Sequence, residues 1–275
     1  MKKIYIHFIC LKLLFINITA VNLFAQAPNS GLSGYFSFDQ LSNSDIIVDS
    51  GTGSGNVGTL NGASLTSDSK SGSNALEINP NSGDSYVDFD NSNSAPFHNA
   101  SGTEMTVAVW LKPGLLDHSE SQRFISVNDQ FGSITYYFEI TTSNELNVFI
   151  STVSDSNGTN SFKNAFAKTV LNPLDSNDIG AWKHVAFTFF TDGSSSYIKI
   201  YIDGIMVTNE DISDVAEHLV VWNRKLHFGG THRSNNGVTT NQFTGSIDEA
   251  YFYNRALSSS EINDLMEAVS STTVY

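Results

Sequence analysis

The residues best suited to ligand chemistry lie in two polar stretches near the C-terminal third of the 275-residue chain. Trp222 is followed directly by an amide and two basic side chains, so an indole ring and several hydrogen-bond donors stand side by side. An exposed indole face with adjacent polar donors is what a sugar-stacking site requires. Packing of Trp222 beneath a long loop is the alternative. His232 and Arg233 lie in a second polar stretch, 231–241, and are further candidate ligand-binding residues.

The spacings that common hydrolases require are absent from the sequence. A retaining glycosidase needs two carboxylates about 5–5.5 Å apart, and no E-x-D-x-x-E pattern supplies them. The H-E-x-x-H zinc motif and the G-x-S-x-G nucleophile elbow are also missing. Gly53, Gly55 and Gly58 match the dinucleotide pattern G-x-G-x-x-G, but a second turn at 59–62 follows where a helix is required. The sequence therefore favours a non-catalytic protein, and a hydrolase or lyase assembled from dispersed positions stays open.

The charge of the chain excludes one class of partner. There are 14 Lys and Arg residues against 28 Asp and Glu residues, which gives a formal net charge of −14. Neutralising the phosphates of a nucleic acid needs clustered basic side chains, so nucleic-acid binding is excluded. The three Trp, ten Tyr and nineteen Phe residues supply a hydrophobic core and exclude an intrinsically disordered chain.

The first 25 residues have the composition of a secretory signal peptide. Lys2 and Lys3 precede a long apolar stretch, and small residues near Ala25 provide a cleavage site. The alternative is a membrane anchor, because the stretch is long enough to span a bilayer. Cleavage after Ala25 removes three lysines and the single cysteine, Cys10, and changes the formal net charge to about −17. No later stretch is apolar enough to span a membrane, so we predict a protein that is secreted (extracellular or periplasmic) or held at the cell surface.

Alternating apolar and polar residues after position 30 predict strands joined by short turns almost throughout. The segments 133–140 and 145–151 predict a hairpin that turns at Ser143 and Asn144. About a dozen strands, with no Pro-rich linker between them, predict an all-β fold: a two-sheet antiparallel jelly-roll sandwich. The clearest strand patterns are 32–39, 105–111, 182–190 and 197–203.

One segment near the C-terminus has the pattern of a helix. Ser258 and Glu261 have the spacing of a capping box, and Leu257 and Ile262 have that of a hydrophobic staple. Four apolar residues from Ile262 to Val269 then share one face at helical spacing. We therefore predict a short C-terminal helix that packs against the β body.

Several ordered stretches resemble one protein family. The best match is FTGSIDE at 243–249, followed by YNRALS at 253–258 and Glu261-Ile262. Weaker matches precede it in the same order: YFSFD at 35–39, DSG at 49–51 with Asn56, GTLNG at 58–62, ALEI at 75–78, Tyr86-Val87, WKHVA at 182–186 and YIDG at 201–204. Together they resemble laminin-G-like (LamG) domains of the concanavalin A-like lectin/glucanase superfamily, as found in exported bacterial proteins.

The resemblance implies one jelly-roll domain over residues 31–270. Domains of this group bind glycans or proteins, which implies a non-catalytic recognition module whose ligand is a carbohydrate, either a polysaccharide or a glycoconjugate. The alternatives that remain open are an adhesion module that binds a cell-surface protein and, further from the pattern, a glycoside hydrolase or polysaccharide lyase. Fold does not determine function, so the loops have to identify the ligand.

The resemblance also implies a structural calcium ion. Calcium takes six to eight oxygen ligands, and acidic strand ends beside a glycine-rich loop suit it. We expect Asp248, Asp39 and Asp49 to provide carboxylates, with Glu249 and Asn56 as weaker candidates. Because Asp248 and Glu249 are adjacent on a strand, their side chains are expected to point to opposite faces, so that one of them reaches the ion. The alternative is that all of these are solvated carboxylates in turns.

Overall fold

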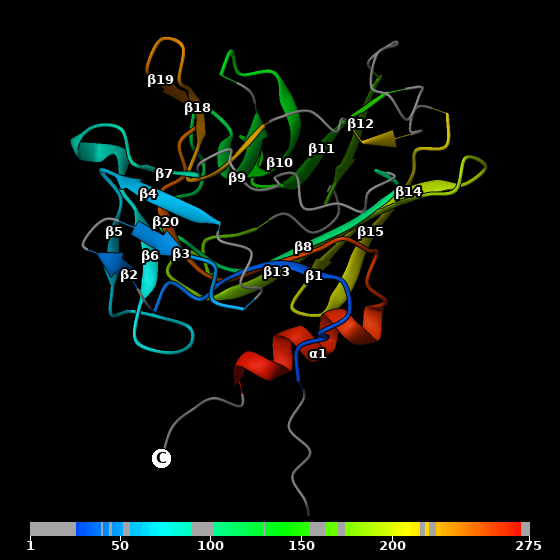
Figure 1. The fold of residues 1–275 in the computed structure, drawn as a ribbon, viewed down its shortest axis with the longest axis horizontal. Helices are drawn as coiled ribbons and strands as arrows, with labels where there is room; N and C mark the ends of the chain where they lie inside the picture. The colour runs from blue at the N-terminus through cyan, green and yellow to red at the C-terminus, as the bar shows by residue number, and fades with distance from the viewer. Residues whose placement is uncertain are drawn as a thin grey trace, which may run out of the picture.

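The structure is a computed structural model that describes residues 26–39, 41–43, 46–51, 56–89, 102–128, 130–153, 163–169, 174–214, 218–219 and 224–270. The signal peptide predicted for 1–25 and the ligand residue predicted at Trp222 lie outside these residues. The described part forms two large antiparallel sheets, with one helix below them in the view of Figure 1.

Sheet A crosses the middle of Figure 1 with its strands β8, β13, β14 and β15, directly above the helix. Its strand order is β15-β14-β13-β8-β20-β6-β5, and β1 also pairs with β20. The strands are β1 (Leu32–Phe36), β5 (Ser64–Thr66), β6 (Ala75–Ile78), β8 (Glu104–Pro113), β13 (Lys183–Thr191), β14 (Ser196–Ile202), β15 (Ile205–Asp211) and β20 (Gly245–Tyr253).

Sheet B places β9, β10, β11 and β12 in the upper part of Figure 1, and a small hairpin of β18 and β19 stands above β9. The strand order is β12-β11-β10-β9-β17-β7-β4-β3-β2, and β16 pairs with β11. The strands of sheet B are β2 (Leu41–Asn43), β3 (Ile46–Val48), β4 (Val57–Asn61), β7 (Tyr86–Phe89), β9 (Gln122–Asn128), β10 (Ile134–Ile140), β11 (Leu146–Val153), β12 (Lys163–Lys168), β16 (His218–Leu219) and β17 (Lys225–Phe228). The remaining elements are the hairpin strands β18 (Thr231–Arg233) and β19 (Val238–Thr240) and the 3-10 turn η1 (Pro80–Ser82).

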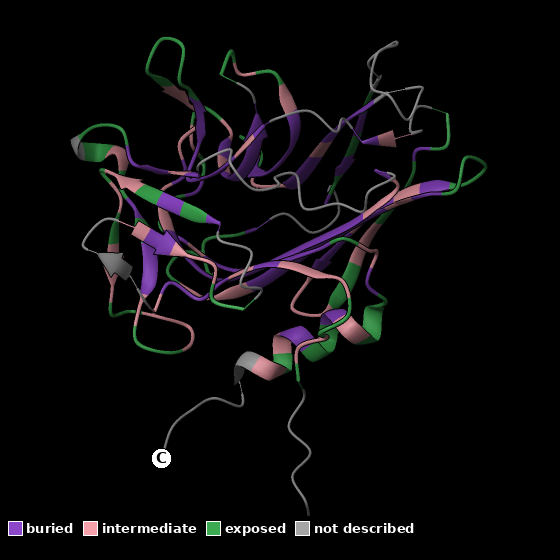
Figure 2. Cartoon of the chain, in the orientation of Figure 1, coloured by how far each residue is buried: buried purple, intermediate pink, exposed green. Residues whose placement is uncertain are grey.

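Apolar side chains from the inner faces of the two sheets form the core. Phe36 of sheet A packs edge-on against Phe89 and Phe228 of sheet B, with ring centroids 4.8 and 5.8 Å apart. Phe187 of sheet A meets Phe138 of sheet B in the same way at 5.4 Å. Figure 2 shows both sheets largely buried, with exposed positions alternating along β4. Burial of large aromatic rings between the sheets therefore holds the sandwich together.

Helix α1 (Ser259–Ser270) covers part of the outer face of sheet A. Ile262 and Leu265 are fully buried there against aromatic rings of the sheet. The N–H of Ser258 donates to Glu261 Oε2 at 2.9 Å, and the N–H of Glu261 donates to Ser258 Oγ at 3.3 Å. The predicted helix and its capping box are therefore confirmed.

The predicted fold class is confirmed as well. Strands make up 54% of the structure, in antiparallel sheets of the jelly-roll kind with one short C-terminal helix. The predicted hairpin is the pair β10 and β11, and Asn144 in its turn has a positive φ of 61°. Among the residues that the structure describes, no helix is long and apolar enough to cross a membrane.

Candidate functional site

A cavity of about 520 Å³ lies on the outer face of sheet B, over β10, β11 and β12. Successive residues of a strand point to opposite faces, and the residues that alternate with those lining the cavity, such as Phe138 and Val148, are buried in the core. The lining comes from the three strands, from the β10–β11 turn and from Ser121 before β9. The lining residues are Ser121, Tyr137, Glu139, Thr141, Thr142, Ser143, Glu145, Asn147, Phe166 and Lys168.

Aromatic rings of neighbouring strands form a ladder at this cavity. Tyr137 stacks on Phe149 with ring centroids 5.0 Å apart and planes 12° apart. Phe149 meets Phe166 edge-on at 5.1 Å. Phe166 stands at the outer strand β12 and is 47% exposed. The ladder therefore presents an accessible aromatic ring that packs against the partly buried ring of Phe149.

A network of hydrogen bonds stands beside the ladder. Glu139 and Arg123 are cross-strand partners, and Arg123 Nε donates to Glu139 Oε2 at 3.0 Å. Asn147 Nδ2 donates to Glu139 Oε1 at 2.9 Å. The Arg123 guanidinium also lies over the Tyr137 ring, 4.0 Å from its centroid. Burial, followed by the charge of Glu139, raises the pKa of Tyr137, so its hydroxyl stays a donor at neutral pH.

One polar atom of this network lacks a partner. Asn147 Oδ1 is buried and accepts no hydrogen bond from any residue that the structure describes. A buried acceptor without a partner costs free energy unless a ligand or water satisfies it. Asn147 belongs to the lining of the cavity, but this oxygen is closed to solvent, so a ligand hydroxyl reaches it only when the side chain moves.

The hairpin of β18 and β19 covers the neighbouring part of the same face. The His232 ring stacks on Tyr86 with centroids 4.3 Å apart, and its Nε2 lies 3.3 Å from the Tyr86 hydroxyl. Its Nδ1 lies 3.1 Å from Thr239 Oγ1. Arg233 is exposed, with its side chain next to Gly132. Both residues were predicted to bind ligand, yet neither lines the cavity, and their ligand roles stay predictions.

The residues predicted to bind calcium separate into two groups. Asp49 and Asn56 lie between β3 and β4 of sheet B, where Asn56 Nδ2 donates to Asp49 Oδ2 at 3.4 Å. Asp248 and Glu249 lie in the middle of β20, with Asp39 near them around the loop 69–74. Tyr35 contacts both groups, since its N–H donates to Asp49 Oδ1 at 3.4 Å and its hydroxyl donates to Glu249 Oε2 at 2.8 Å.

Backbone N–H groups occupy both carboxylate oxygens of Asp248. Its Oδ2 accepts from Lys70 and Ser71 at 2.8 and 3.1 Å, and its Oδ1 accepts from Glu249 at 2.8 Å. Burial raises the pKa of Asp248 to about 8 despite these donors. Asp39 Oδ1 similarly accepts from the backbone of the 69–74 loop at 2.6 and 3.1 Å.

The expectation that Asp248 and Glu249 point to opposite faces is wrong. The register of β20 on β8 shifts after Asp248, and Glu249 has a positive φ of 50°. A bulge of this kind interrupts the alternation of side chains. Both carboxylates consequently bond to Ser71, and Glu249 Oε2 also accepts from the hydroxyls of Tyr35 and Tyr251 at 2.8 and 2.9 Å.

These contacts do not fit a calcium site in this arrangement. Among the described residues, no group of three or more His, Cys, Asp or Glu side chains is placed to hold a metal ion. Calcium requires six to eight oxygen ligands, whereas the oxygens of Asp248 are satisfied by backbone donors. A calcium ion therefore stays a prediction that a binding experiment has to test.

A match to a protein family covers the region of the cavity. The family model of the concanavalin A-like lectin/glucanases superfamily, Laminin_G_3, matches residues 81–263. The chain belongs to the concanavalin A-like lectin/glucanase superfamily. The resemblance predicted from short ordered segments is thereby confirmed. All residues that line the cavity lie within the matched part of this superfamily member. No curated protein matches the sequence.

Solved structures share the fold of this superfamily member. Domain 4 of AbnA, an extracellular GH43 arabinanase of Geobacillus stearothermophilus in complex with arabinotriose, is 20% identical with a TM-score of 0.55, over 86% of this chain and 98% of that domain. The binding domain of botulinum neurotoxin DC in complex with SialylT is 12% identical with a TM-score of 0.60, over 88% of this chain and 52% of that chain. The same binding domain in complex with rat synaptotagmin II is 14% identical with a TM-score of 0.59 over the same shares.

The present chain spans about half the length of the botulinum binding domains that it matches. At these low identities the similarity shows the fold alone.

Proposed function

We propose that this chain is an exported, non-catalytic recognition module that binds carbohydrate on the outer face of β10, β11 and β12. The observation that carries the proposal is the meeting of an aromatic ladder with a hydrogen-bond network in one cavity of about 520 Å³. This volume lies within the range of about 300–1,000 Å³ that is usual for small-molecule sites.

The chemistry of the cavity suits a sugar. A sugar ring presents C–H bonds on its faces and hydroxyl groups around its edge. The exposed ring of Phe166 can pack against a sugar face. Glu145 and Ser143, which are less buried than Glu139 and Asn147, can accept hydrogen bonds from hydroxyl groups, and Lys168 can donate one. Each part of a sugar therefore has a matching group in the cavity.

The environment of the acidic residues supports a binding role over a catalytic one. Glu139 already receives hydrogen bonds on both oxygens, from Arg123 and Asn147. Glu145 lies next to Thr141 in the β10–β11 turn, with Oε2 3.5 Å from the Thr141 hydroxyl. A glycosidase needs one carboxyl group free to transfer a proton and a second as base or nucleophile. Release of reducing ends or of unsaturated products from polysaccharides by the purified protein would contradict the non-catalytic assignment.

The proposal also includes export of the protein and a neutral carbohydrate as its partner. The predicted signal peptide at 1–25 supports secretion or display at the cell surface of a bacterium. The net negative charge supports a neutral polysaccharide or glycoconjugate rather than a polyanion. One similar structure is named as a complex with arabinotriose, which is consistent with a carbohydrate ligand on this fold.

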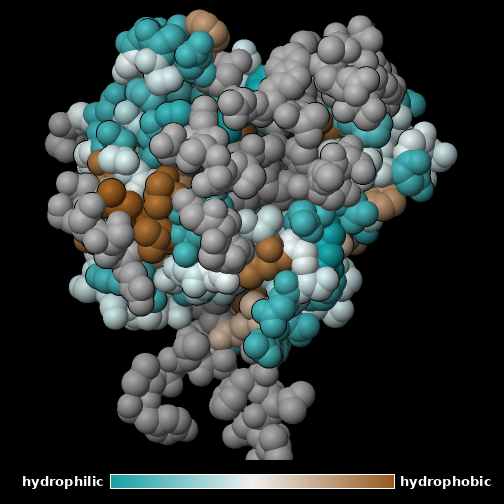
Figure 3. All heavy atoms as spheres, in the orientation of Figure 1, coloured by the Kyte–Doolittle hydropathy of each residue, from teal (hydrophilic) through white to brown (hydrophobic). Residues whose placement is uncertain are grey.

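A cell-surface protein is the second candidate partner. The outer strand β15 of sheet A carries Ile205 and Met206, which are large exposed apolar side chains. Figure 3 shows apolar residues gathered in a few patches on a surface that is otherwise mostly hydrophilic in that view. An exposed strand edge with apolar side chains can pair with an extended segment of another protein. Pull-down of a polypeptide from envelope extracts that survives glycosidase treatment and is lost in Ile205→Lys would favour this candidate.

The proposal is tested by a glycan array followed by calorimetry on the polysaccharides that bind. Phe166→Ala should weaken binding about tenfold, or about 1.4 kcal/mol. Its melting temperature should stay close to that of the wild type, because the ring is already half exposed. Phe131→Ala is the matched control, since Phe131 is 63% exposed and does not line the cavity.

Two outcomes would contradict the proposal. Equal losses in Phe166→Ala and Phe131→Ala would show that the β10–β12 face is not the binding site. Absence of binding to every glycan on the array would exclude the carbohydrate ligand and favour the protein partner.

A further inference from the structure

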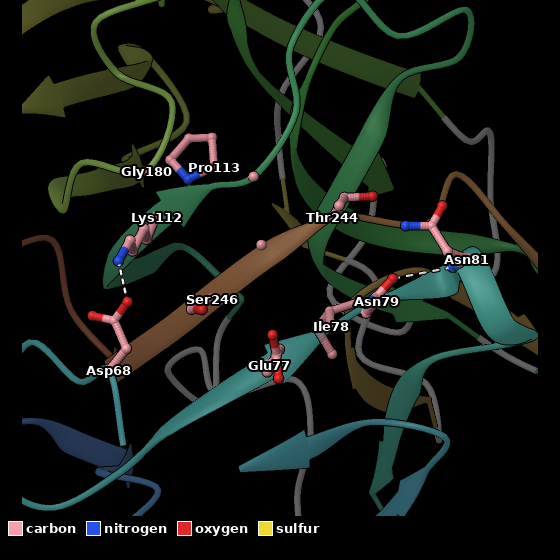
Figure 4. A pocket seen from close by; sticks show the side chains of 12 residues that line it. Asp68, Glu77, Ile78, Asn79, Asn81, Lys112, Pro113, Gly180, Thr244 and Ser246 are labelled. Carbon is pink, nitrogen blue, oxygen red and sulfur yellow. Dashed lines mark hydrogen bonds and ion pairs between the residues drawn. The ribbon is translucent and has the colours of Figure 1, made fainter. Parts of the chain in front are cut away.

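A second cavity, of about 250 Å³, lies on the outer face of sheet A and is the subject of Figure 4. A row of polar side chains crosses three adjacent strands beneath it. Ser246 of β20 pairs in register with Glu77 of β6 on one side and with Lys112 of β8 on the other. Their strand neighbours Leu76 and Leu111 belong to the core, so the row points away from it. Adjacent strands lie about 4.8 Å apart, which makes the row a short ladder of an acid, an alcohol and a base.

Further polar groups close the two ends of this cavity. At one end Lys112 forms an ion pair with Asp68, and Figure 4 shows the two side chains pointing toward each other. At the other end stand Asn79 and Asn81, where Asn79 Oδ1 accepts the N–H of Asn81 at 3.2 Å. The complete lining is Asp68, Glu77, Ile78, Asn79, Asn81, Lys112, Pro113, Gly114, Gly180, Thr244, Gly245 and Ser246.

The backbone at the edge of the cavity requires glycine at position 245. Its φ is +144°, and a Cβ atom there would lie 2.2 Å from the carbonyl oxygen of Lys112. The same Cβ atom would lie 2.7 Å from the buried Phe243 ring, so a side chain at this position would displace β20 from β8 and disturb the register that aligns Ser246 with Lys112.

The mixture of donors and acceptors selects one kind of ligand. The carboxyl oxygens of Asp68 and Glu77 accept hydrogen bonds, the amine of Lys112 donates, and the serine hydroxyl and the two amides do both. The two carboxylates outnumber the one ammonium, which disfavours an anion, and the ion pair of Lys112 with Asp68 leaves Glu77 as the one carboxylate without a cation beside it in the cavity. An alcohol group both donates and accepts, so a neutral ligand that carries several hydroxyl groups satisfies every member of the set.

The walls of the cavity contain little apolar surface for stacking. Ile78 and Pro113 are its only apolar side chains among the described lining residues. Trp182 lies beyond Lys112, whose Nζ is 5.9 Å from the ring centroid. Binding would consequently depend on hydrogen bonds, each with a net contribution of about 1 kcal/mol.

We propose that this cavity is a second ligand site, for one neutral, hydroxyl-rich sugar unit, on the side of the sandwich opposite to β10–β12. The proposal does not depend on the site on sheet B, because the two cavities share no residue. If both sites bind glycans, one short oligosaccharide cannot occupy both outer faces, so the module would bridge two glycan chains rather than bind one chain more tightly.

The test uses nuclear magnetic resonance of the mature protein with a panel of methyl glycosides of neutral hexoses and pentoses. We expect amide shifts of residues 245–246, Glu77 and Lys112, with dissociation constants in the millimolar range. Glu77→Gln and Ser246→Ala should each weaken binding at this site about fivefold, as the loss of one hydrogen bond predicts. Glu210→Gln removes a charge from an exposed position on β15 of the same sheet and is the matched control.

Several results would overturn the proposal. No shift at these amides with any member of the panel would exclude a sugar site. Unchanged binding in both Glu77→Gln and Ser246→Ala would place the sugar elsewhere. Tighter binding of a uronic acid glycoside or an amino sugar glycoside than of every neutral glycoside would exclude the neutral class. Phe166→Ala separates the two sites, because it should weaken binding at β10–β12 about tenfold and leave the shifts on β6, β8 and β20 in place.

Discussion

The two outer faces of this sandwich share one plan and differ in chemistry. On sheet A, α1 covers one part of the face, and a cavity opens over β6, β20 and β8. On sheet B, the hairpin of β18 and β19 covers one part, and a cavity opens over β10, β11 and β12. On sheet A the helix buries aromatic rings and leaves a polar row accessible, whereas on sheet B the hairpin covers Tyr86 and an aromatic ladder stays at the cavity.

The ion pairs of the two cavities illustrate the difference. Arg123 and Glu139 on sheet B are largely buried, with the Glu139 side chain 5% exposed. Lys112 and Asp68 on sheet A form a surface pair, with the Asp68 side chain 63% exposed. Surface pairs stabilise proteins by about 0–1 kcal/mol, whereas removing one partner of a buried pair costs about 3–5 kcal/mol. The face of sheet B is thus fixed in geometry, and the face of sheet A can rearrange around a ligand.

The largest effect should come from breaking the buried pair. We expect Glu139→Ala to lower the free energy of unfolding by about 3 kcal/mol or more, because Arg123 would remain buried without a carboxylate. Asp68→Ala should lower it by less than about 1 kcal/mol. Urea denaturation of both variants measures the two values under one condition. Equal losses would contradict the contrast between a fixed and an adaptable face.

Local patterns in the sequence predicted the sandwich but not the two cavities. The alternation in 133–140 and 145–151 is set by residues two positions apart, so the hairpin and its turn could be predicted. Glu139 lies in the first of these segments, but its contact with Arg123 depends on the pairing of β9 with β10. Register between strands decides which side chains meet, and a single strand does not contain that information.

Two further features of the cavities were not predicted from the sequence. The inward residues of β12 are Ala165 and Ala167, which are depleted in strands, so the accessible ring of Phe166 between them was not recognised. Glu77, Ser246 and Lys112 come from distant parts of the chain and meet through the strand order of sheet A. The signal that could have found Phe166 is the alternation of exposed Asn164, Phe166 and Lys168 with the two alanines.

A second comparison between the sheets concerns two buried histidines. Burial lowers the pKa of both His184 on β13 of sheet A and His227 on β17 of sheet B to about 3, and a nearby Lys70 contributes for His184. The unfolded chain binds a proton near pH 6.5, so stability should fall from about pH 6.5 down to about pH 3, by about 1.4 kcal/mol per pH unit for each histidine. His184→Leu should reduce this dependence, measured by urea denaturation between pH 4 and 7.

The two histidines should show effects of similar size. Nearby groups oppose protonation of both rings, Lys70 for His184 and His232 with Lys225 for His227. Asp88 Oδ1 lies 3.6 Å from His227 Nδ1. His227→Leu should therefore reduce the acid dependence about as much as His184→Leu does. A much smaller reduction in His227→Leu would indicate that Asp88 stabilises the protonated ring of His227.

Thermal melting with and without calcium tests whether an ion joins the two sheets. A ligand that binds the folded state alone stabilises it by about 2.7 kcal/mol at a free concentration of 100 times its dissociation constant. The melting temperature should then be higher in millimolar calcium than in chelator. Asp248→Ala on sheet A and Asp49→Ala on sheet B should each remove the difference, because the predicted site needs both groups. Identical melting temperatures in calcium and in chelator would contradict the predicted calcium site. If only one of the two variants removes the difference in melting temperature, the ion is bound by one sheet alone.

The smallest expected effect concerns the element that covers sheet A. Arg255 donates to both carboxylate oxygens of Glu261, at 3.0 and 2.6 Å, and chiefly through these bonds lowers the pKa of Glu261 to about 2. A lowered pKa of an acid means that the stabilisation is present above the unfolded value of about 4.5 and is lost as the pH falls toward 2. The pair is partly exposed to solvent, so its contribution to the free energy of unfolding, together with that of the capping box, should be about 1 kcal/mol.

Glu261→Gln keeps a side chain that can complete the capping box, and Glu261→Ala removes both interactions, so the alanine variant should lose more stability. Hydrogen exchange distinguishes the two faces: amides of sheet A beneath α1 should exchange faster in Glu261→Ala, whereas amides of sheet B beneath the β18–β19 hairpin should keep their wild-type rates, since no contact of Glu261 reaches that sheet within the described residues. Faster exchange on both sheets would mean that the covering elements are coupled through the core, and the two outer faces could then no longer be treated as independent.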